Sequence, residues 1–367
     1  MENRKKERFF KNINFHSFWI IVIFRIINIF FIRTWFVPDE YWQSLEVAHH
    51  MIFGFGYLTW EWKEGLRSYF HPLIFSGLYK ILYFLNLDNN LFLIQFSPRL
   101  LQAFLSSISD WCFYQFIYLH FGRHIANLSL FCLFTSWFWW YCATRTLINT
   151  FEVSLVCFAS LYYSKHIKNG FLKLSSSFIL FVVIATLTFF VRPTSLSVWF
   201  SYFIFYLIYS YKTSNLKVLL KIISIIFITA FPNIILLIII DKSFYEKWIL
   251  VHLNFLNFNV INNQGIFYGE HPWYWYFTQG LPVVIFSQLP FSFGGIIKCL
   301  NLTEAKDSFT FNQRFMFKVY ICTIVMSLII YSLPGHKEFR FILISCRFPH
   351  FSLGFLSQIF LKKLVKN

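Results

Sequence analysis

The 367 residues are 57% hydrophobic and 23% aromatic, and their mean hydropathy of +0.56 lies far above that of an ordinary soluble domain. The net charge of +16 sits mostly in short clusters between apolar runs, and no basic face with interleaved stacking aromatics is laid out, which argues against nucleic-acid binding. We therefore predict an all-α membrane protein, a polytopic helical bundle of about nine to eleven hydrophobic segments without a separate soluble domain.

The N-terminal segment is the first predicted element. Residues 1–17 are basic, and the apolar run that follows at 18–36 contains Arg25 and Arg33 but no small-residue cleavage site. This pattern predicts a cytosolic tail followed by an uncleaved membrane span. Further candidate spans follow in chain order, the last of them optional: 72–88, 97–120, 125–143, 147–163, 174–191, 194–210, 219–240, 274–296, 315–333 and 341–361.

The positive-inside rule tests how these runs cross the membrane. Basic connectors at 121–124, 164–173 and 211–221 should all face the cytosol. They cannot all do so if every apolar run crosses fully. The run at 72–88 is only about 17 residues long and contains Lys80, so it is short for a crossing. If it re-enters or lies along the surface, all three connectors become cytosolic together.

The same topology gathers the remaining polar segments on the lumenal side. Ionisable groups are costly near a membrane, so several clusters on one face of an apolar bundle predict a site for a charged substrate. The sequon at Asn301 falls on the cytosolic side, and we predict that it carries no glycan. The lumenal segments are two loops, 37–71 and 241–273, and the polar clusters 144–152, 191–194, 262–276 and 335–341.

An acidic pair, Asp39 and Glu40, follows the first span in a chain with only 16 acidic residues. The preceding Pro38 favours a helix start, where the helix dipole stabilises negative charge, so one interpretation is purely structural. Adjacent side chains cannot both point at one place, which argues against a facing pair of glycosidase carboxylates. In the functional interpretation, one carboxylate is a general base and the other supports it.

Cationic side chains in the other lumenal clusters are suited to hold a phosphate leaving group. The candidates are Arg145, His336, Lys337 and Arg340, and arginine favours bidentate phosphate contacts. The sequence contains no glycine-rich nucleotide cradle, which favours a lipid-borne donor.

Each cluster also has a structural interpretation. Arg145 and Glu152 lie seven residues apart, so they are able to form an ion pair on one helix face. The aromatic run after His271 is typical of an interfacial anchor, and 336–341 is typical of a charged span boundary. The cysteines lack metal-ligand spacing and are interpreted as packing residues, so no metal or cofactor is predicted. They are Cys112, Cys132, Cys142, Cys157, Cys299, Cys322 and Cys346.

Five segments, in order along most of the chain, resemble glycosyltransferase family 22, the GT-C membrane mannosyltransferases. Within the family, YGEHPWYWYFTQGLP is more similar to the branch that builds GPI anchors, at its third mannose, than to the relatives that build the N-glycan precursor. The segments are VPDEYWQSLEVAHHMIFGFGYLTWEWKEGLRSY (37–69), CATRTLINTFE (142–152), VRPTSL (191–196), FNVINNQGIFYGEHPWYWYFTQGLPV (258–283) and HKEFRF (336–341).

The resemblance implies a multi-pass GT-C domain over 18–361 in the endoplasmic reticulum membrane. It implies transfer of mannose from dolichyl-phosphate mannose, in α-1,2 linkage and with inversion, as the third mannose of the GPI precursor. Asp39 is implied as the catalytic carboxylate, with Glu40 beside it. Substrate contacts are assigned to His271, Arg145, His336, Lys337, Glu338 and Arg340, with Lys337 and Arg340 on the donor phosphate.

The stretch 344–367 departs from the family pattern and is interpreted as an atypical, truncated C-terminus. Three alternatives stay open. The chain is a sibling enzyme that uses the same donor on the N-glycan precursor, an inactive truncated fragment, or a transporter. The absence of paired halves with matching broken spans disfavours the transporter.

Overall fold

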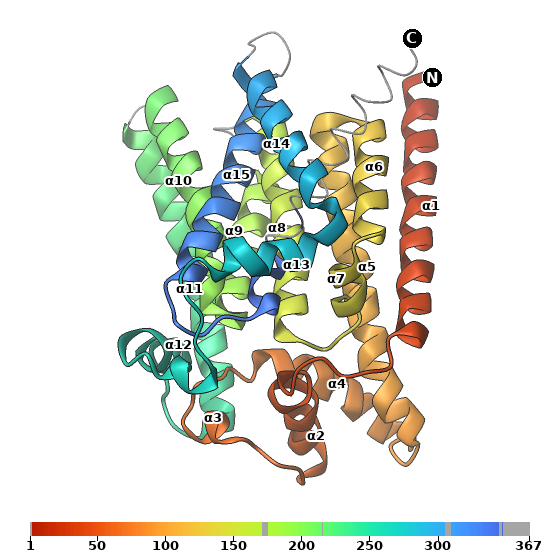
Figure 1. Ribbon diagram of the computed structural model, residues 1–367, viewed down its shortest axis with the longest axis vertical. Helices are drawn as coiled ribbons and strands as arrows, with labels where there is room; N and C mark the ends of the chain where they lie inside the picture. The colour runs from red at the N-terminus through yellow and green to blue at the C-terminus, as the bar shows by residue number, and fades with distance from the viewer. Residues whose placement is uncertain (1, 171–174, 215, 305–309, 345–346, 348–367) are drawn as a thin grey trace.

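The computed structural model describes residues 2–170, 175–214, 216–304, 310–344 and 347. Within these residues the chain forms helices joined by loops, with a bundle of long helices and a layer of short helices across one end (Figure 1). The predicted all-α class is confirmed. The bundle helices are α1 (Glu2–Phe31), α5 (Leu91–Phe121), α6 (Arg123–Phe134), α7 (Trp137–Cys142), α8 (Ile148–Asn169), α9 (Ser176–Val191), α10 (Leu196–Thr213), α11 (Leu216–Tyr245), α13 (Leu281–Ile285), α14 (Leu289–Glu304) and α15 (Phe311–Ser332).

The end layer comes from two segments far apart in the chain, which include the predicted loops 37–71 and 241–273 and, after the first of these, helix α4. The last turns of α11 join them: Asp241 accepts hydrogen bonds from the Ser68 hydroxyl and the Tyr69 amide, both at 2.9 Å, and the Tyr245 hydroxyl donates to the Arg67 carbonyl. Both loops are therefore folded against each other. Their elements are η1 (Tyr41–Leu45), α2 (Glu46–Phe53), α3 (Trp60–Lys63), α4 (Phe70–Phe84), α12 (Val251–Leu256), η3 (Asn257–Ile261) and η4 (Gln264–Tyr268).

Helix α4 occupies the run that was expected to re-enter or lie along the surface. It has 15 residues and so measures roughly 22 Å, shorter than the hydrocarbon core of about 30 Å. Phe75 and Tyr79 of α4 pack with Ala48 of α2 in a small apolar cluster. Figure 1 shows α4 beside α2 across the end of the bundle, which supports the surface alternative.

With α4 in the end layer, the bundle helices alternate in direction so that three of their turns lie at the opposite end. The turns between α5 and α6, α8 and α9, and α10 and α11 lie at the end that carries the N-terminus (Figure 1). The described parts of the three basic connectors therefore share one end, as the charge argument predicted. Helix α14 also finishes at this end, which agrees with the side expected for the sequon at Asn301, whereas the absence of a glycan stays a prediction.

Among the described residues, four helical stretches are long and apolar enough to cross a membrane: α5, α11, Tyr276–Ile297 and α15. Shorter apolar helices cover Ser17–Phe31 and Ser176–Val191. Helix α8 has 22 residues but is less apolar, because Asn149, Glu152 and other polar side chains on it are buried against neighbouring helices. Helix α8 thus owes its place to packing inside the bundle rather than to its own hydropathy.

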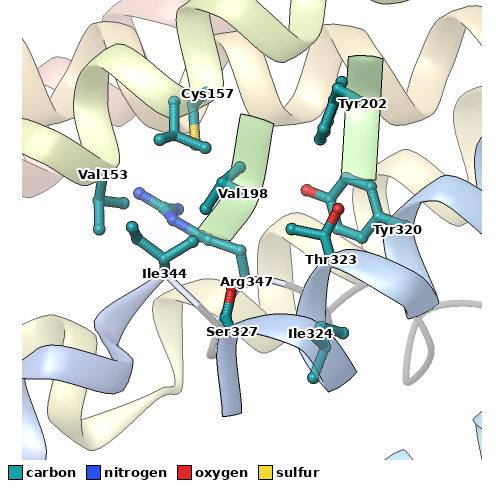
Figure 2. A pocket seen from close by; sticks show the side chains of 11 residues that line it. Val153, Cys157, Val198, Tyr202, Tyr320, Thr323, Ile324, Ser327, Ile344 and Arg347 are labelled. Carbon is teal, nitrogen blue, oxygen red and sulfur yellow. The ribbon is translucent and has the colours of Figure 1, made fainter. Parts of the chain in front are cut away.

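A buried charge cluster ties three parts of the bundle together. Asp110 of α5 accepts hydrogen bonds from Arg25 of α1 at 2.7 Å, from Arg347 at 2.8 Å and from the Trp139 indole at 3.1 Å. Figure 2 shows Arg347 among the side chains of a small cavity of about 20 Å³ that includes Cys157, room for about one water molecule. The optional span 341–361 begins as η7 (Phe339–Leu343), and apart from Ile344 and Arg347 its remainder lies outside the described residues, as does most of 344–367.

Candidate active site

The acidic pair stands at a helix start, as Pro38 predicted. The amide of Glu40 donates to the Val37 carbonyl and that of Tyr41 to the Pro38 carbonyl, which closes the first turn at Asp39. The chain then continues into η1 and α2. The dipole of this helix start stabilises both carboxylates. The acidic pair therefore has the helix-start role that the structural interpretation gave it, which leaves room for a functional role as well.

The two carboxylates point into different surroundings. The Asp39 side chain is 26% exposed and lines a cavity, where its Oδ2 lies 2.7 Å from Nη2 of Arg340. The Glu40 side chain is buried, and its Oε2 lies 2.9 Å from Nη1 of Arg145 and 3.3 Å from the Phe36 amide. The expectation that one carboxylate acts and the other supports it is therefore consistent with Asp39 as the exposed member.

Arg145 is placed differently from its prediction as a phosphate ligand. It is fully buried behind the cavity wall and donates four hydrogen bonds, to the Tyr141 carbonyl, the Thr34 carbonyl and hydroxyl, and Glu40. Its guanidinium also lies over the Tyr141 ring, 4.1 Å from the centroid. Arg145 is thus corrected from a substrate contact to a structural partner of Glu40, because its donors are used inside the protein.

The predicted helix-face pair of Arg145 with Glu152 is also wrong. Glu152 instead accepts a hydrogen bond from Nη1 of Arg192 at 2.7 Å, across 40 residues of sequence. Arg145 precedes α8, whereas Glu152 lies inside it, so the two residues do not share one continuous helix.

The cavity has a volume of about 670 Å³, within the range of small-molecule sites. It lies between the bundle and the end layer. Its walls come from the acidic helix start, from α3 and the residues after it, from η3 and η4, from the turn between α9 and α10, and from the segment 334–341. All four polar clusters named from the sequence therefore contribute lining residues, and the cluster 144–152 does so through Ile148 and Asn149.

The HKEFRF segment forms an ionic network around Asp39. One carboxylate oxygen of Glu338 lies 2.6 Å from Nη2 of Arg340 and 3.0 Å from Nε2 of His336, and Nη2 also contacts Asp39. Burial alone raises the pKa of Glu338, but the hydrogen bond from His336 and the Arg340 guanidinium outweigh it and lower the pKa to about 2. Glu338 thus holds Arg340 in place while Arg340 contacts the carboxylate predicted as base.

Lys337 and His271 fix the loop that carries this network. The Lys337 ammonium donates to the carbonyls of His271 at 2.9 Å, Pro334 at 2.5 Å and Gly335 at 3.4 Å, and the residue is only 3% exposed. Its three donors are therefore directed at the backbone, which corrects its assignment to the donor phosphate. The His271 ring lines the cavity and stacks on Trp275, with centroids 4.6 Å apart.

Three ionisable cavity residues escaped the sequence-based site prediction: Glu61, Arg67 and Arg192. Glu61 accepts hydrogen bonds from Arg67 at 2.8 Å and from Gln43 at 3.2 Å. Glu61 and Arg67 stand in the longest family-like segment and Arg192 in a polar cluster. Their position in those segments was the available signal, but their pairing depends on tertiary contacts.

The arrangement places a carboxylate at the wall of a cavity that also contains arginines and imidazoles. A carboxylate in hydrogen-bond reach of a hydroxyl is suited to accept its proton, and guanidinium groups are suited to stabilise charge on a phosphate. Tyr331, near the end of the membrane-length helix α15, lines the cavity together with residues of the end layer, so a lipid-borne phosphate and a water-facing sugar can meet there.

Comparisons with known proteins identify the family of this chain. Residues 16–362 match the model of the Alg9-like mannosyltransferase family. The chain is 38% identical to GPI alpha-1,2-mannosyltransferase 3 of Homo sapiens over 95% of this chain and 61% of the relative. It is 41% identical to the Mus musculus protein of the same name over 93% of this chain and 58% of the relative. The chain thus spans about three fifths of the length of these relatives.

The fold is also similar to that of a solved structure, ArnT from Cupriavidus metallidurans bound to undecaprenyl phosphate. The TM-score is 0.59 at 11% identity, over 94% of this chain and 59% of ArnT. This likeness confirms the fold expected from the resemblance, a helical membrane bundle of the GT-C type. With the family model covering nearly the whole sequence, the chain belongs to the Alg9-like mannosyltransferase family.

Proposed function

We propose that this chain transfers the third mannose, in α-1,2 linkage, from dolichyl-phosphate mannose to the GPI precursor at the lumenal face of the endoplasmic reticulum membrane. The proposal is supported by the identity of about 40% to proteins named as GPI mannosyltransferases, over most of this chain. The observation that carries it is the cavity at the ends of the long helices, in which Asp39 contacts Arg340.

The proposed reaction is a single displacement. The acceptor hydroxyl oxygen attacks the anomeric carbon of the donor mannose, and the bond between that carbon and the phosphate oxygen breaks. Asp39 takes the hydroxyl proton, and dolichyl phosphate leaves with the bonding electron pair. One base is sufficient because a phosphate leaving group needs little protonation, and the reaction then inverts the anomeric carbon.

The other residues prepare this step. His336 holds Glu338, and Glu338 holds Arg340, which positions the Asp39 carboxylate at the cavity wall. Burial of the donor sugar in the cavity brings the reacting atoms together and excludes water, which is a large part of the rate gain for such reactions. The aromatic wall around Tyr268 and Phe258 supplies flat surfaces for sugar rings.

Complementation tests this proposal. The chain is expressed in cells that lack the third GPI mannosyltransferase, with the human relative as positive control. We expect GPI-anchored proteins to return to the cell surface and the two-mannose precursor to decline. If the precursor persists although the chain is present in the membrane, the chain is inactive and the proposal fails. A change in the N-glycan precursor instead would favour the sibling enzyme.

A further inference from the structure

The cavity contains four strongly basic side chains, Arg67, Arg192, Lys337 and Arg340, and they are not equally free to bind an anion. The Lys337 ammonium is directed at three carbonyls. One terminal nitrogen of Arg340 is shared by two carboxylates, those of Asp39 and Glu338. A phosphate placed at Arg340 therefore meets two like charges, which oppose its binding.

Arg192 has a different electrostatic setting. Within the described part of the chain, its guanidinium donates one hydrogen bond, to Glu152, which is 1% exposed and is not among the residues that line the cavity. The arginine fork has five donors, so one carboxylate leaves capacity for a second acceptor. The pair of Arg192 and Glu152 is neutral as a whole and does not repel a phosphate as the Arg340 cluster does.

The position of Arg192 also fits a lipid phosphate. It follows the last residue of α9 and directly precedes η2 (Pro193–Ser195), which leads into α10, so it stands at the ends of two apolar helices. Its guanidinium lies 5.3 Å from the centroid of the Phe341 ring, and that of Arg340 lies 5.6 Å from the same ring. Arg192 is therefore next to the group that positions Asp39 without being part of it.

Two buried hydroxyls line the cavity near Arg192. Tyr331 is 5% exposed, and its hydroxyl interacts with those of Thr194 and Ser197 and with the Arg192 charge. Thr194 lines the same cavity two residues after Arg192. A hydroxyl hydrogen rotates freely, so an O–H of this group is able to turn toward a phosphate oxygen at the cavity wall.

We infer that Arg192, with the hydroxyls of Thr194 and Tyr331, binds the phosphate of the lipid-linked sugar donor, whereas Arg340 serves as a positioning residue for Asp39. This inference rests on the proposed function for the identity of the donor. It divides the arginines of the cavity into one that holds the leaving group and one that holds the base. Glu152 keeps the fork of Arg192 in place from behind.

A binding measurement tests the inference without requiring catalysis. The purified chain is reconstituted in nanodiscs and titrated with dolichyl phosphate, with dolichol as the matched lipid that lacks the phosphate. We expect binding of dolichyl phosphate, and we expect the double variant Arg192→Gln/Glu152→Gln to weaken it about 10- to 100-fold, the loss of one or two hydrogen bonds to a charged group. The neutral pair retains the shape and a hydrogen bond, so folding is preserved.

A charge swap separates binding from structure. In Arg192→Glu/Glu152→Arg the ion pair is retained but its cation moves away from the cavity, so a purely structural role predicts wild-type binding. We expect the swap to bind dolichyl phosphate as weakly as the neutral pair, or more weakly. Wild-type binding by either double variant would overturn the inference.

A second cavity arginine serves as the matched control. Arg67→Gln should leave dolichyl phosphate binding within about 2-fold of wild type, because Arg67 makes no contact in the inferred site.

A second lipid tests the source of the phosphate. Phosphatidylinositol in place of dolichyl phosphate represents the acceptor lipid, and binding of this lipid alone in an Arg192-dependent manner would overturn the assignment to the donor. If dolichyl phosphate binds through Arg192 but complementation fails, the inference stands and the proposed activity falls.

Discussion

Two arginine–carboxylate pairs begin at adjacent residues of one helix start, and they have opposite surroundings. Glu40 pairs with Arg145 in a fully buried position where every neighbour is protein. Asp39 pairs with Arg340 at a cavity wall, 26% exposed and within a network of further ionisable groups. The difference shows how one turn of helix can anchor itself with one carboxylate and present the other to a substrate.

Breaking the buried pair should have the largest effect on stability. Arg145→Met leaves Glu40 buried without its counter-ion, and removal of one partner from such a pair typically costs about 3–5 kcal/mol. We expect a large loss of folded protein in the membrane, measured by thermal unfolding in detergent. The double variant Arg145→Met/Glu40→Gln, which removes both charges, should recover a substantial part of that loss. Equal instability of both variants would contradict the structural role of the pair.

On the cavity side, Glu338 should make stability depend on pH. Its pKa is lowered from 4.5 to about 2, so its contribution to folding is fully present above about pH 4.5 and is lost as the pH falls toward 2. The contribution is at most about 3 kcal/mol, because the side chain is partly exposed and solvent screens it. The stability difference between wild type and Glu338→Gln should therefore shrink between pH 5 and about pH 2. A constant difference across this range would rule out the ionised network.

Lys337 should matter as a clamp rather than as a phosphate ligand. Lys337→Met removes hydrogen bonds to the carbonyls of His271, Pro334 and Gly335, with an expected loss of about 1–3 kcal/mol of stability. Once the remaining folded protein is quantified, the affinity for dolichyl phosphate should be close to wild type. A selective loss of donor affinity without loss of stability would restore Lys337 as a phosphate ligand.

Tyr276 should give the smallest effect. Its hydroxyl donates to the Glu338 carbonyl at 3.2 Å and accepts from the Glu338 amide at 3.3 Å, so Tyr276→Phe should cost about 1 kcal/mol. Thermal unfolding measures this cost, with Tyr274→Phe as the control, because Tyr274 is half exposed and its ring lies outside the cavity lining. A larger loss from the control would show that the hydroxyl of Tyr276 does not support the network.

The sequence was informative where local pattern decides structure. The apolar runs and basic connectors led to the bundle and to the expectation that 72–88 re-enters or lies along the surface, and Pro38 led to the helix start at Asp39. HKEFRF and the acidic pair were expected on one side, and the structure brings Asp39, His336, Glu338 and Arg340 together.

What could not be predicted is which charged groups pair. Spacing along a helix reveals only local partners, so it suggested a pair of Arg145 with Glu152. In the structure Arg145 pairs with Glu40, 105 residues away, and Glu152 pairs with Arg192, 40 residues away. The same limit concealed Glu61 and Arg67, whose place in the cavity depends on the contacts of Asp241 and Tyr245 with the end layer. Lys337 was predicted as a phosphate ligand because the sequence does not reveal its carbonyl partners. One of them, the carbonyl of His271, lies 66 residues away in the chain.

The most direct test of the central claim compares the two neighbouring carboxylates in one assay. Microsomes containing equal amounts of folded wild type, Asp39→Asn or Glu40→Gln are given labelled dolichyl-phosphate mannose and the two-mannose GPI precursor, and single-turnover transfer is measured. Loss of a general base predicts that Asp39→Asn transfers mannose about 10²- to 10⁴-fold more slowly. Glu40→Gln should keep most of its rate per folded molecule. Transfer by Asp39→Asn at the wild-type rate would contradict the account.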